Sequence, residues 1–185
     1  MAHIGMDLNR FIVEEERKYP DATGSLTLAL TAIETSAKII SSRVRMAGLA
    51  DILGKAGRTN GQGEEVQKLN VFANELLIQQ LSDSGQFFAL ASEEYEDPIF
   101  PENGKDGKYV IAFDPLDGST NINVNINVGT IFSIHRREDG SIADLFQPGY
   151  KQVAAGYIVY GSSTIMVYST GNGVNGFIHD PSVGL

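Results

Sequence analysis

Apolar residues recur along the first half of the chain at spacings of three and four, which is the period of an α-helix. The pattern predicts a short helix over residues 4–19, which ends at Pro20. A long helix follows, with an apolar stripe that ends before Gly48, and a third helix is predicted between residues 66 and 85. The stripe of the long helix consists of Leu26, Leu30, Ile33, Ala37, Ile40, Val44 and Ala47.

The second half of the chain changes to short apolar runs of strand length, separated by turn residues. The turn at Gly161 and Ser162, between two alternating runs, is the clearest hairpin signal. Helices first and strands afterwards predict an α+β fold, in which layered helices pack on a mixed, largely antiparallel sheet. The predicted strands cover residues 87–92, 108–113, 128–136, 152–160, 163–169 and a segment beginning at 176–179.

A glycine-rich segment, residues 54–63, separates the second and third predicted helices. It has four glycines, no hydrophobic periodicity, and basic side chains at Lys55 and Arg58. Glycine together with basic residues is compatible with phosphate binding, but the Walker spacing is missing. Taken alone, the segment is therefore interpreted as a flexible connector.

The composition argues against a nucleic-acid-binding, membrane-spanning or disulfide-bonded protein. The chain has 185 residues, 42% of them hydrophobic, and a net charge of -9, which argues against nucleic acid or an anionic membrane as its main partner. No run approaches the roughly 18 apolar residues of a membrane-spanning helix, and the first residues lack a signal-peptide pattern. The sequence contains no cysteine, so disulfides and thiolate metal sites are excluded. We expect an acidic globular protein of the cytoplasm.

Two pairs of carboxylates carry the strongest chemical signal. Asp114 and Asp117 follow a predicted buried strand, and Pro115 between them fixes φ, so we expect the chain to turn there instead of continuing the ladder. Glu93 and Glu94 directly follow the preceding strand. Four carboxylates at the ends of neighbouring strands would repel one another unless cations neutralise them. Oxygen ligands without His or Cys favour Mg²⁺ or Mn²⁺ over zinc.

An anion-binding segment follows the second pair. Gly118 allows a ligand to approach the backbone, and the amides and hydroxyls of Ser119 and Thr120 can donate to a phosphate. Divalent cations beside such a cradle are typical of a phosphoester hydrolase. A solvated acidic loop is the alternative for each pair alone, but the combination favours the functional interpretation.

At these residues the chain resembles a known superfamily. Ser92-Glu93-Glu94 and the run Asp-Pro-Leu-Asp-Gly-Ser-Thr-Asn at 114–121 resemble the metal site of the lithium-sensitive sugar phosphatases, which include inositol monophosphatases and fructose-1,6-bisphosphatases. The resemblance extends almost continuously from about residue 8 to residue 185. Stretches similar to class I fructose-1,6-bisphosphatase in particular are residues 57–60, 67–69, 128–132, 147–149 and 153–162.

The resemblance implies a site for Mg²⁺-dependent hydrolysis of fructose 1,6-bisphosphate to fructose 6-phosphate, a reaction of gluconeogenesis. It implies that Gly118, Ser119 and Thr120 hold the 1-phosphate. It further implies catalytic roles at the positions of Glu94, Glu64 and Asn70, and a dynamic loop from about residue 53 to 65. The implied ligands of Mg²⁺, or of Mn²⁺ in its place, are Glu93, Glu94, Asp114, Asp117 and the carbonyl of Leu116.

The resemblance also implies a remote site for the inhibitor AMP and a homotetrameric assembly of the full-length form. The alternative is that the basic residues of this set are surface charges and the threonines are helix caps. Ser25 stands where the family's AMP site has a glutamate. The residues that match the AMP site are Thr23, Gly24, Thr27, Lys108, Tyr109 and Arg136.

Two amides and the chain length depart from the family pattern. Asn70 and Asn123 replace aspartates, and an amide cannot take up a proton as a carboxylate can. The family's proteins are longer, and the sequence halts at Leu185 directly after a strand signal. We therefore expect residues 1–185 to be the N-terminal, AMP-type and metal-site domain of a two-domain phosphatase, without its C-terminal substrate domain and incomplete for activity.

Three alternatives remain open. An inositol-monophosphatase-like enzyme is disfavoured because the chain has no Trp and places Ile122 where that branch has an aromatic residue. A non-catalytic nucleotide-binding or regulatory subunit is favoured by Asn70 and disfavoured by the intact carboxylates. A structural or interaction protein would use the carboxylates only as a solvated rim. Neither His135 nor His179 belongs to a metal-ligand spacing pattern in the sequence, so we assign them no role.

Overall fold

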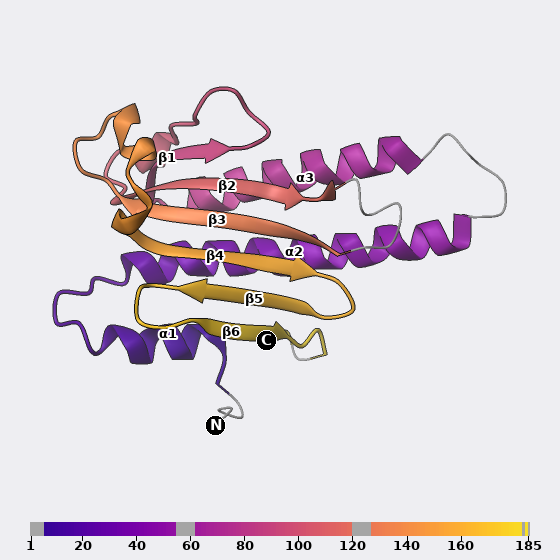
Figure 1. Ribbon diagram of the computed structural model, residues 1–185, viewed down its shortest axis with the longest axis horizontal. Helices are drawn as coiled ribbons and strands as arrows, with labels where there is room; N and C mark the ends of the chain where they lie inside the picture. Colours follow the sequence, from indigo (N-terminus) through magenta and orange to yellow (C-terminus); the bar gives the residue numbers. More distant parts are fainter. Residues whose placement is uncertain (1–5, 55–61, 120–126, 183, 185) are drawn as a thin grey trace.

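Three α-helices, three short 3-10 helices and a six-stranded sheet make up the described part of the chain, which confirms the predicted α+β class. The structure is a computed structural model that describes residues 6–54, 62–119, 127–182 and 184. Figure 1 shows the helices of the first half of the chain and the strands of the second. The helices are α1 (Leu8–Glu16), α2 (Ser25–Gly54) and α3 (Gln62–Asp83).

The helix boundaries differ from the predicted ones at several places; α1, for example, ends at Glu16 rather than at Tyr19. The side chain of Asp7 accepts a hydrogen bond from the amide of Arg10 (2.7 Å), so α1 begins after this cap rather than near residue 4. The prediction that Gly48 ends the long helix is wrong, because α2 continues to Gly54. A glycine inside a helix costs only about 1 kcal/mol relative to alanine, which the rest of a long helix offsets.

The six strands pair in their order along the chain, β1-β2-β3-β4-β5-β6. β1 and β2 are parallel and all the other neighbours are antiparallel, so the predicted mixed, largely antiparallel sheet is confirmed. Four of the predicted strands agree with the structure to within one residue at both ends. The strands are β1 (Phe87–Ser92), β2 (Tyr109–Asp117), β3 (Val128–Arg136), β4 (Gln152–Tyr160), β5 (Thr164–Ser169) and β6 (Asn175–His179).

β2 does not stop where the sequence predicts. The expectation that Pro115 ends the ladder is wrong: the register shifts between Asp114 and Asp117, and pairing resumes opposite Gly129. Proline lacks an amide proton, and a bulge accommodates it without ending the strand. The Pro115 carbonyl accepts a hydrogen bond from Thr130 Oγ1 (2.8 Å), which ties the bulge to β3.

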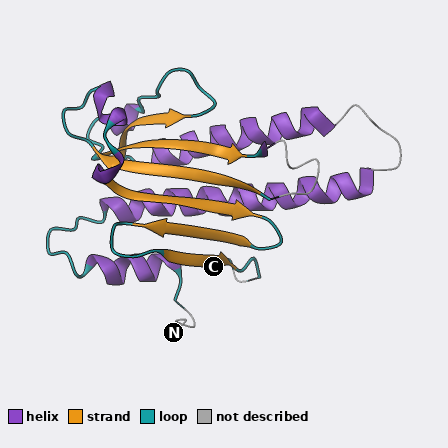
Figure 2. Cartoon of the chain, viewed as in Figure 1, coloured by secondary structure: helices purple, strands orange, loops and turns teal. Residues whose placement is uncertain are grey.

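The helices cover one face of the sheet, and the hydrophobic core lies between the two layers (Figure 2). α1 closes the end of this layer near β6, where the ring of Phe11 packs edge-on against Phe177 at 5.5 Å. Among the described residues, no helix is long and apolar enough to cross a membrane. Core residues with the most deeply buried side chains include Leu30, Ile33, Ile40, Leu77, Leu81, Phe87, Leu90, Ile111 and Ile158.

Candidate functional site

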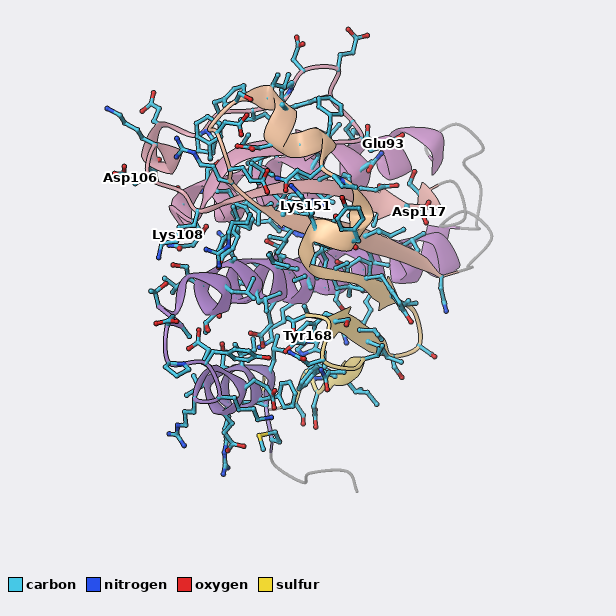
Figure 3. The ribbon with its side chains drawn as sticks, turned by 60° about the vertical axis from the view of Figure 1, so that its left-hand side comes forward. Glu93, Asp106, Lys108, Asp117, Lys151 and Tyr168 are labelled. Atoms are coloured by element: carbon cyan, nitrogen blue, oxygen red, sulfur yellow. The ribbon has the colours of Figure 1, made fainter. Side chains whose placement is uncertain are left out.

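The parallel pairing of β1 and β2 brings the two carboxylate pairs together. Ser92 pairs with Phe113, and the amide of Glu93 donates to the Phe113 carbonyl (3.0 Å). The carboxyl ends of parallel strands lie at the same edge of a sheet, so Glu93 comes beside Asp114. Figure 3 shows Glu93 and Asp117 at this same end of the molecule.

The charges of these carboxylates act on one another. The charge of Asp114 is the largest cause that raises the pKa of Glu93, followed by the charge of Glu94. Burial raises the pKa of Asp114, the charges of Asp117 and Glu94 add to the effect, and the amide of Leu116 (3.0 Å to Oδ1) opposes it. The site therefore concentrates negative charge that a cation would stabilise.

α3 supplies two asparagines that hold this end of β1. Asn70 Nδ2 donates to Glu94 Oε1 (2.6 Å), which orients the carboxylate. One turn further along, the buried Asn74 accepts a hydrogen bond from Ser92 Oγ (2.7 Å). Asn74 supports the strand end that carries Glu93 and Glu94, and it was not predicted from the sequence. Its signal is the spacing of four from Asn70, which places both amides on one face of the helix.

The chemistry of the donor set fits a hard divalent cation such as Mg²⁺. All the side-chain donors are oxygens, and the shielded Oδ1 of Asn70 has no hydrogen-bond partner among the described residues. Within the described ranges, however, no three acidic or histidine side chains are close enough to surround one ion. A bound cation would therefore draw these side chains closer together or take ligands from elsewhere.

An open hollow of about 480 Å³ lies beside the carboxylates, on the face of the sheet that the helices leave uncovered. Glu93 and Asp114 line it together with small or apolar residues such as Ala112 and Ile131. The site is thus reached from this face of the sheet.

The anion-binding segment is only partly described. Gly118 follows the carboxylates with φ 72°, a left-handed conformation that favours glycine. Ser119 is half-buried beside it, whereas Thr120 lies outside the described residues. The backbone of Glu64 belongs to the first turn of α3, but its side chain and residues 55–61 of the expected loop also lie outside them.

The residues of the expected AMP site gather at the other end of the sheet. Lys108 Nζ donates to Thr23 Oγ1 (2.8 Å), which joins the start of β2 to the loop before α2. Tyr109 pairs with Arg136 across β2 and β3. Figure 3 places Lys108 far from Glu93 and Asp117, and Tyr109 is separated from Asp117 by eight residue-to-residue steps along β2, of about 3.3 Å each.

Glu16, at the end of α1, lies among the residues of the expected AMP site, although the sequence analysis did not predict it. Thr27 Oγ1 donates to Glu16 Oε1 (2.5 Å). Burial raises the pKa of Tyr109, the charge of Arg136 opposes the rise, and the charge of Glu16 adds to it. Gly24 has φ 75°, and its carbonyl accepts the hydrogen bond from the Leu28 amide that begins α2. The six expected residues therefore belong to one neighbourhood that includes an acidic side chain.

Comparison with known proteins gives consistent results. Residues 6–185 match the family model described as "Fructose-1-6-bisphosphatase, N-terminal domain". Class 1 fructose-1,6-bisphosphatases of Sulfurihydrogenibium sp. (strain YO3AOP1) and Persephonella marina are 71% and 66% identical over 185 residues, all of this chain but 57% and 58% of theirs.

Two solved structures of fructose-1,6-bisphosphatase from Leishmania major are similar. The T-state structure has a TM-score of 0.80 at 36% identity, with 97% of this chain and 55% of that chain covered. The holo structure has a TM-score of 0.77 at 37% identity and covers 97% and 52%. The chain thus spans little more than half the length of the proteins it matches.

Proposed function

The chain belongs to the family of class 1 fructose-1,6-bisphosphatases, and from this premise we propose that it supplies the metal-binding and phosphate-binding half of an enzyme that hydrolyses fructose 1,6-bisphosphate to fructose 6-phosphate. One observation carries the proposal: two carboxylate pairs meet at the ends of the parallel strands β1 and β2, where the charge of Asp114 raises the pKa of Glu93, and burial together with the neighbouring charges raises the pKa of Asp114. Such a cluster is suited to divalent cations beside a phosphate ester.

Each residue of the site has a role in this proposal. Mg²⁺, or Mn²⁺ in its place, held by Glu93, Glu94, Asp114, Asp117 and the Leu116 carbonyl, would polarise the phosphoryl group and acidify a bound water. Gly118, Ser119 and Thr120 donate hydrogen bonds to the oxygens of the 1-phosphate. The oxygen of water forms a bond to phosphorus, and the bond from phosphorus to the sugar oxygen breaks. The sugar oxygen takes up a proton from solvent to become a hydroxyl group, and inorganic phosphate leaves.

Proton transfer from the attacking water is assigned to the acidic side chains. Glu94 is the acceptor that the described geometry supports, because Asn70 holds its carboxylate from α3 (2.6 Å). Glu64 is proposed to assist it. Asn70 acts only as a hydrogen-bonding group, because an amide does not take up a proton at neutral pH.

The domain assignment is part of the proposal. Residues 1–185 form the N-terminal metal-site domain. The sugar and the 6-phosphate bind to a separate substrate domain, which corresponds to the additional length of the relatives. The shares of 57% and 58% of the relatives' lengths support this division. The 185-residue chain is then incomplete for catalysis.

The test is phosphate release from fructose 1,6-bisphosphate, with and without Mg²⁺. It compares the 185-residue chain with a chimera, in which this chain is followed by the remaining part of the Sulfurihydrogenibium protein. We expect hydrolysis only by the chimera and only with Mg²⁺. Asp114→Asn should abolish it, whereas Glu96→Gln, at an exposed carboxylate after β1, should not. Metal-independent turnover, or equal turnover by the short chain, would contradict the proposal.

AMP binding at the far end of the sheet is a second part of the proposal. It is supported by the contact between Lys108 and Thr23 and by the pairing of Tyr109 with Arg136. Calorimetric titration with AMP, with Lys108→Ala as the variant and Lys105→Ala as the control, tests it. If the chimera binds AMP but releases no phosphate, the alternative of a non-catalytic regulatory subunit is favoured. Asn70 supports that alternative, because it replaces a carboxylate.

Assembly and location complete the proposal. We expect a homotetramer for the longer form and a cytoplasmic location. Sedimentation of the chimera and fractionation of cells that express it would test these two expectations separately.

A further inference from the structure

Glu16 is the acidic side chain among the residues of the expected AMP site. It is the last residue of α1 and is half-buried. Its Oε1 accepts the hydrogen bond from Thr27 Oγ1 (2.5 Å), and Thr27 lies in the first turn of α2. That first turn has no acidic residue of its own. A carboxylate from another helix therefore supplies the negative charge that the start of a helix favours.

The charge of Glu16 also acts on the strand side of the same site. Burial is the main cause that raises the pKa of Tyr109, and the charge of Arg136 opposes the rise, whereas the charge of Glu16 adds to it. The carboxylate is thus near the start of β2 as well as near the start of α2.

The other charges of the site are positive. Lys108 and Arg136 are exposed, and within the described ranges neither of them forms a salt bridge. The Lys108 ammonium donates to Thr23 (2.8 Å), but it has three N–H groups, so it can also donate to a ligand. The two cations favour an anionic ligand, whereas the carboxylate of Glu16 repels one.

The hydroxyl of Thr27 cannot serve Glu16 and a ligand oxygen at the same time. A threonine hydroxyl has one proton to donate, and Glu16 accepts it. A phosphate oxygen that takes this donor has first to displace the carboxylate. The displacement leaves the core intact, because the half-buried side chain at the end of α1 turns out to solvent.

We propose that Glu16 is an internal competitor at this site, where its carboxylate occupies Thr27 until a nucleoside monophosphate displaces it. The inference rests on the proposed function and names the residue that sets the affinity of its AMP part. Glu16 stabilises the empty site and opposes the occupied one. It therefore raises the concentration of AMP at which the site fills.

A supporting role for Glu16 is the competing interpretation. Ser25 stands where the family's AMP site has a glutamate, and it is buried with its Oγ 3.0 Å from Thr23 Oγ1. In this interpretation Glu16 replaces that glutamate and binds the nucleotide. The contact with Thr27 favours competition, because it uses a donor that the nucleotide would otherwise receive. The two interpretations predict opposite effects of the same substitution.

Calorimetric titration of the 185-residue chain with AMP separates them. Glu16→Gln keeps the size of the side chain and removes its charge, and we expect it to bind AMP about 10-fold more tightly than the wild type. Glu16→Ala also frees the Thr27 hydroxyl and should bind at least as tightly. Glu14→Gln is the matched control, because Glu14 lies on the same helix and pairs with Arg10 (3.1 Å). It should change the affinity by less than about twofold.

Thermal unfolding reads the empty site. Without ligand, Glu16→Gln should lower the Tm by about 2 °C, because the start of α2 loses a negative charge and a charge-assisted hydrogen bond. At the same excess of AMP, the Tm of this variant should rise by more than that of the wild type. A purely structural role of Glu16 would lower the Tm and leave the shift with AMP unchanged, which would overturn the proposal.

The titration also separates this inference from the proposed function. Equal or weaker AMP binding by Glu16→Gln and Glu16→Ala would overturn the competitor role and leave the AMP site in place. Binding by these variants but not by the wild type would support competition in its strongest form. If no variant bound AMP, the AMP part of the proposed function would fail and the inference with it. Phosphate release by the chimera tests the hydrolase part separately.

Discussion

At the scale of single residues, the carboxylate of Glu93 is held at a cost to stability. Its neighbours raise its pKa above the value of the unfolded chain, so at neutral pH its charge opposes folding. This destabilisation appears as the pH rises through the unfolded pKa and is relieved as Glu93 becomes protonated at lower pH. A divalent cation at the site would reverse the sign of the interaction.

Replacement of Glu93 should therefore have opposite effects with and without metal. Glu93→Gln is expected to raise the Tm of the chain in EDTA and to remove most of the Tm increase that Mg²⁺ produces. Differential scanning fluorimetry over a range of Mg²⁺ concentrations measures both. The control Glu96→Gln changes the same charge outside the cluster and should do neither. A lower Tm of Glu93→Gln in EDTA would show that the charges do not repel as described.

His135 is a buried residue to which the sequence assigned no role. It is 7% exposed, and its Nε2 has no hydrogen-bond partner among the described residues. Burial lowers its pKa, opposed by a hydrogen bond with the backbone of Pro148. The unfolded chain therefore binds a proton more readily below about pH 6.5, so the stability that depends on neutral His135 is lost as the pH falls.

The pH dependence of unfolding tests this assignment. The free energy of unfolding of the wild type should decrease from pH 7 to pH 5.5 by up to about 1.4 kcal/mol per pH unit more than that of His135→Asn. Urea unfolding at several pH values measures the difference. Parallel curves for the two proteins would mean that His135 keeps its ordinary pKa.

At the scale of elements, α3 and the end of β1 are joined by side chains as well as by apolar packing. The bond from Ser92 Oγ to Asn74 Oδ1 is buried, and the amide of Glu94 donates to the same Ser92 oxygen (3.3 Å). Asn70, one turn before Asn74, holds Glu94 itself. The position of the acidic site thus depends on the register between this helix and this strand.

Loss of the buried amide should weaken both the fold and the site. Asn74→Ala leaves Ser92 without its acceptor and is expected to cost about 1–3 kcal/mol of unfolding free energy. Gln79→Ala, at an exposed position of the same helix, should change stability by less than about 0.5 kcal/mol. Chemical denaturation of the three proteins measures these differences. Equal stability of Asn74→Ala and the wild type would indicate that water replaces the lost partner.

At the scale of the whole molecule, stability should be graded across the sheet. β3 and β4 are central and paired on both sides, whereas β6 is an edge strand with half-exposed residues. The long helices shield only one face of the sheet, so its opposite face adds little protection in the isolated chain. Elements with few buried contacts open at a lower free energy than the core.

Native-state hydrogen exchange would measure this gradient. Amides of β3 and β4 should exchange only through global unfolding, whereas those of β6 should exchange through local openings of lower free energy. Uniform protection of all six strands would contradict the one-sided architecture.

Several elements could be predicted because their signals are local. β3 and β4 are bounded by turn residues and consist of apolar alternation, so their predicted ends agree with the structure. Gly48 and Pro115 failed as stop signals, because each propensity amounts to only a few kcal/mol and the surrounding helix or sheet outweighs it.

The sequence by itself determined the order of the elements, the fold class and the carboxylates that end β1 and β2, because hydrophobic periodicity and a nearly continuous motif are properties of adjacent residues. Only the tertiary structure decided which groups meet: Asn70 with Glu94, Asn74 with Ser92, and Glu16 with Thr27. These contacts join residues far apart in the chain. They depend on how helices and strands pair in space, which no local pattern specifies.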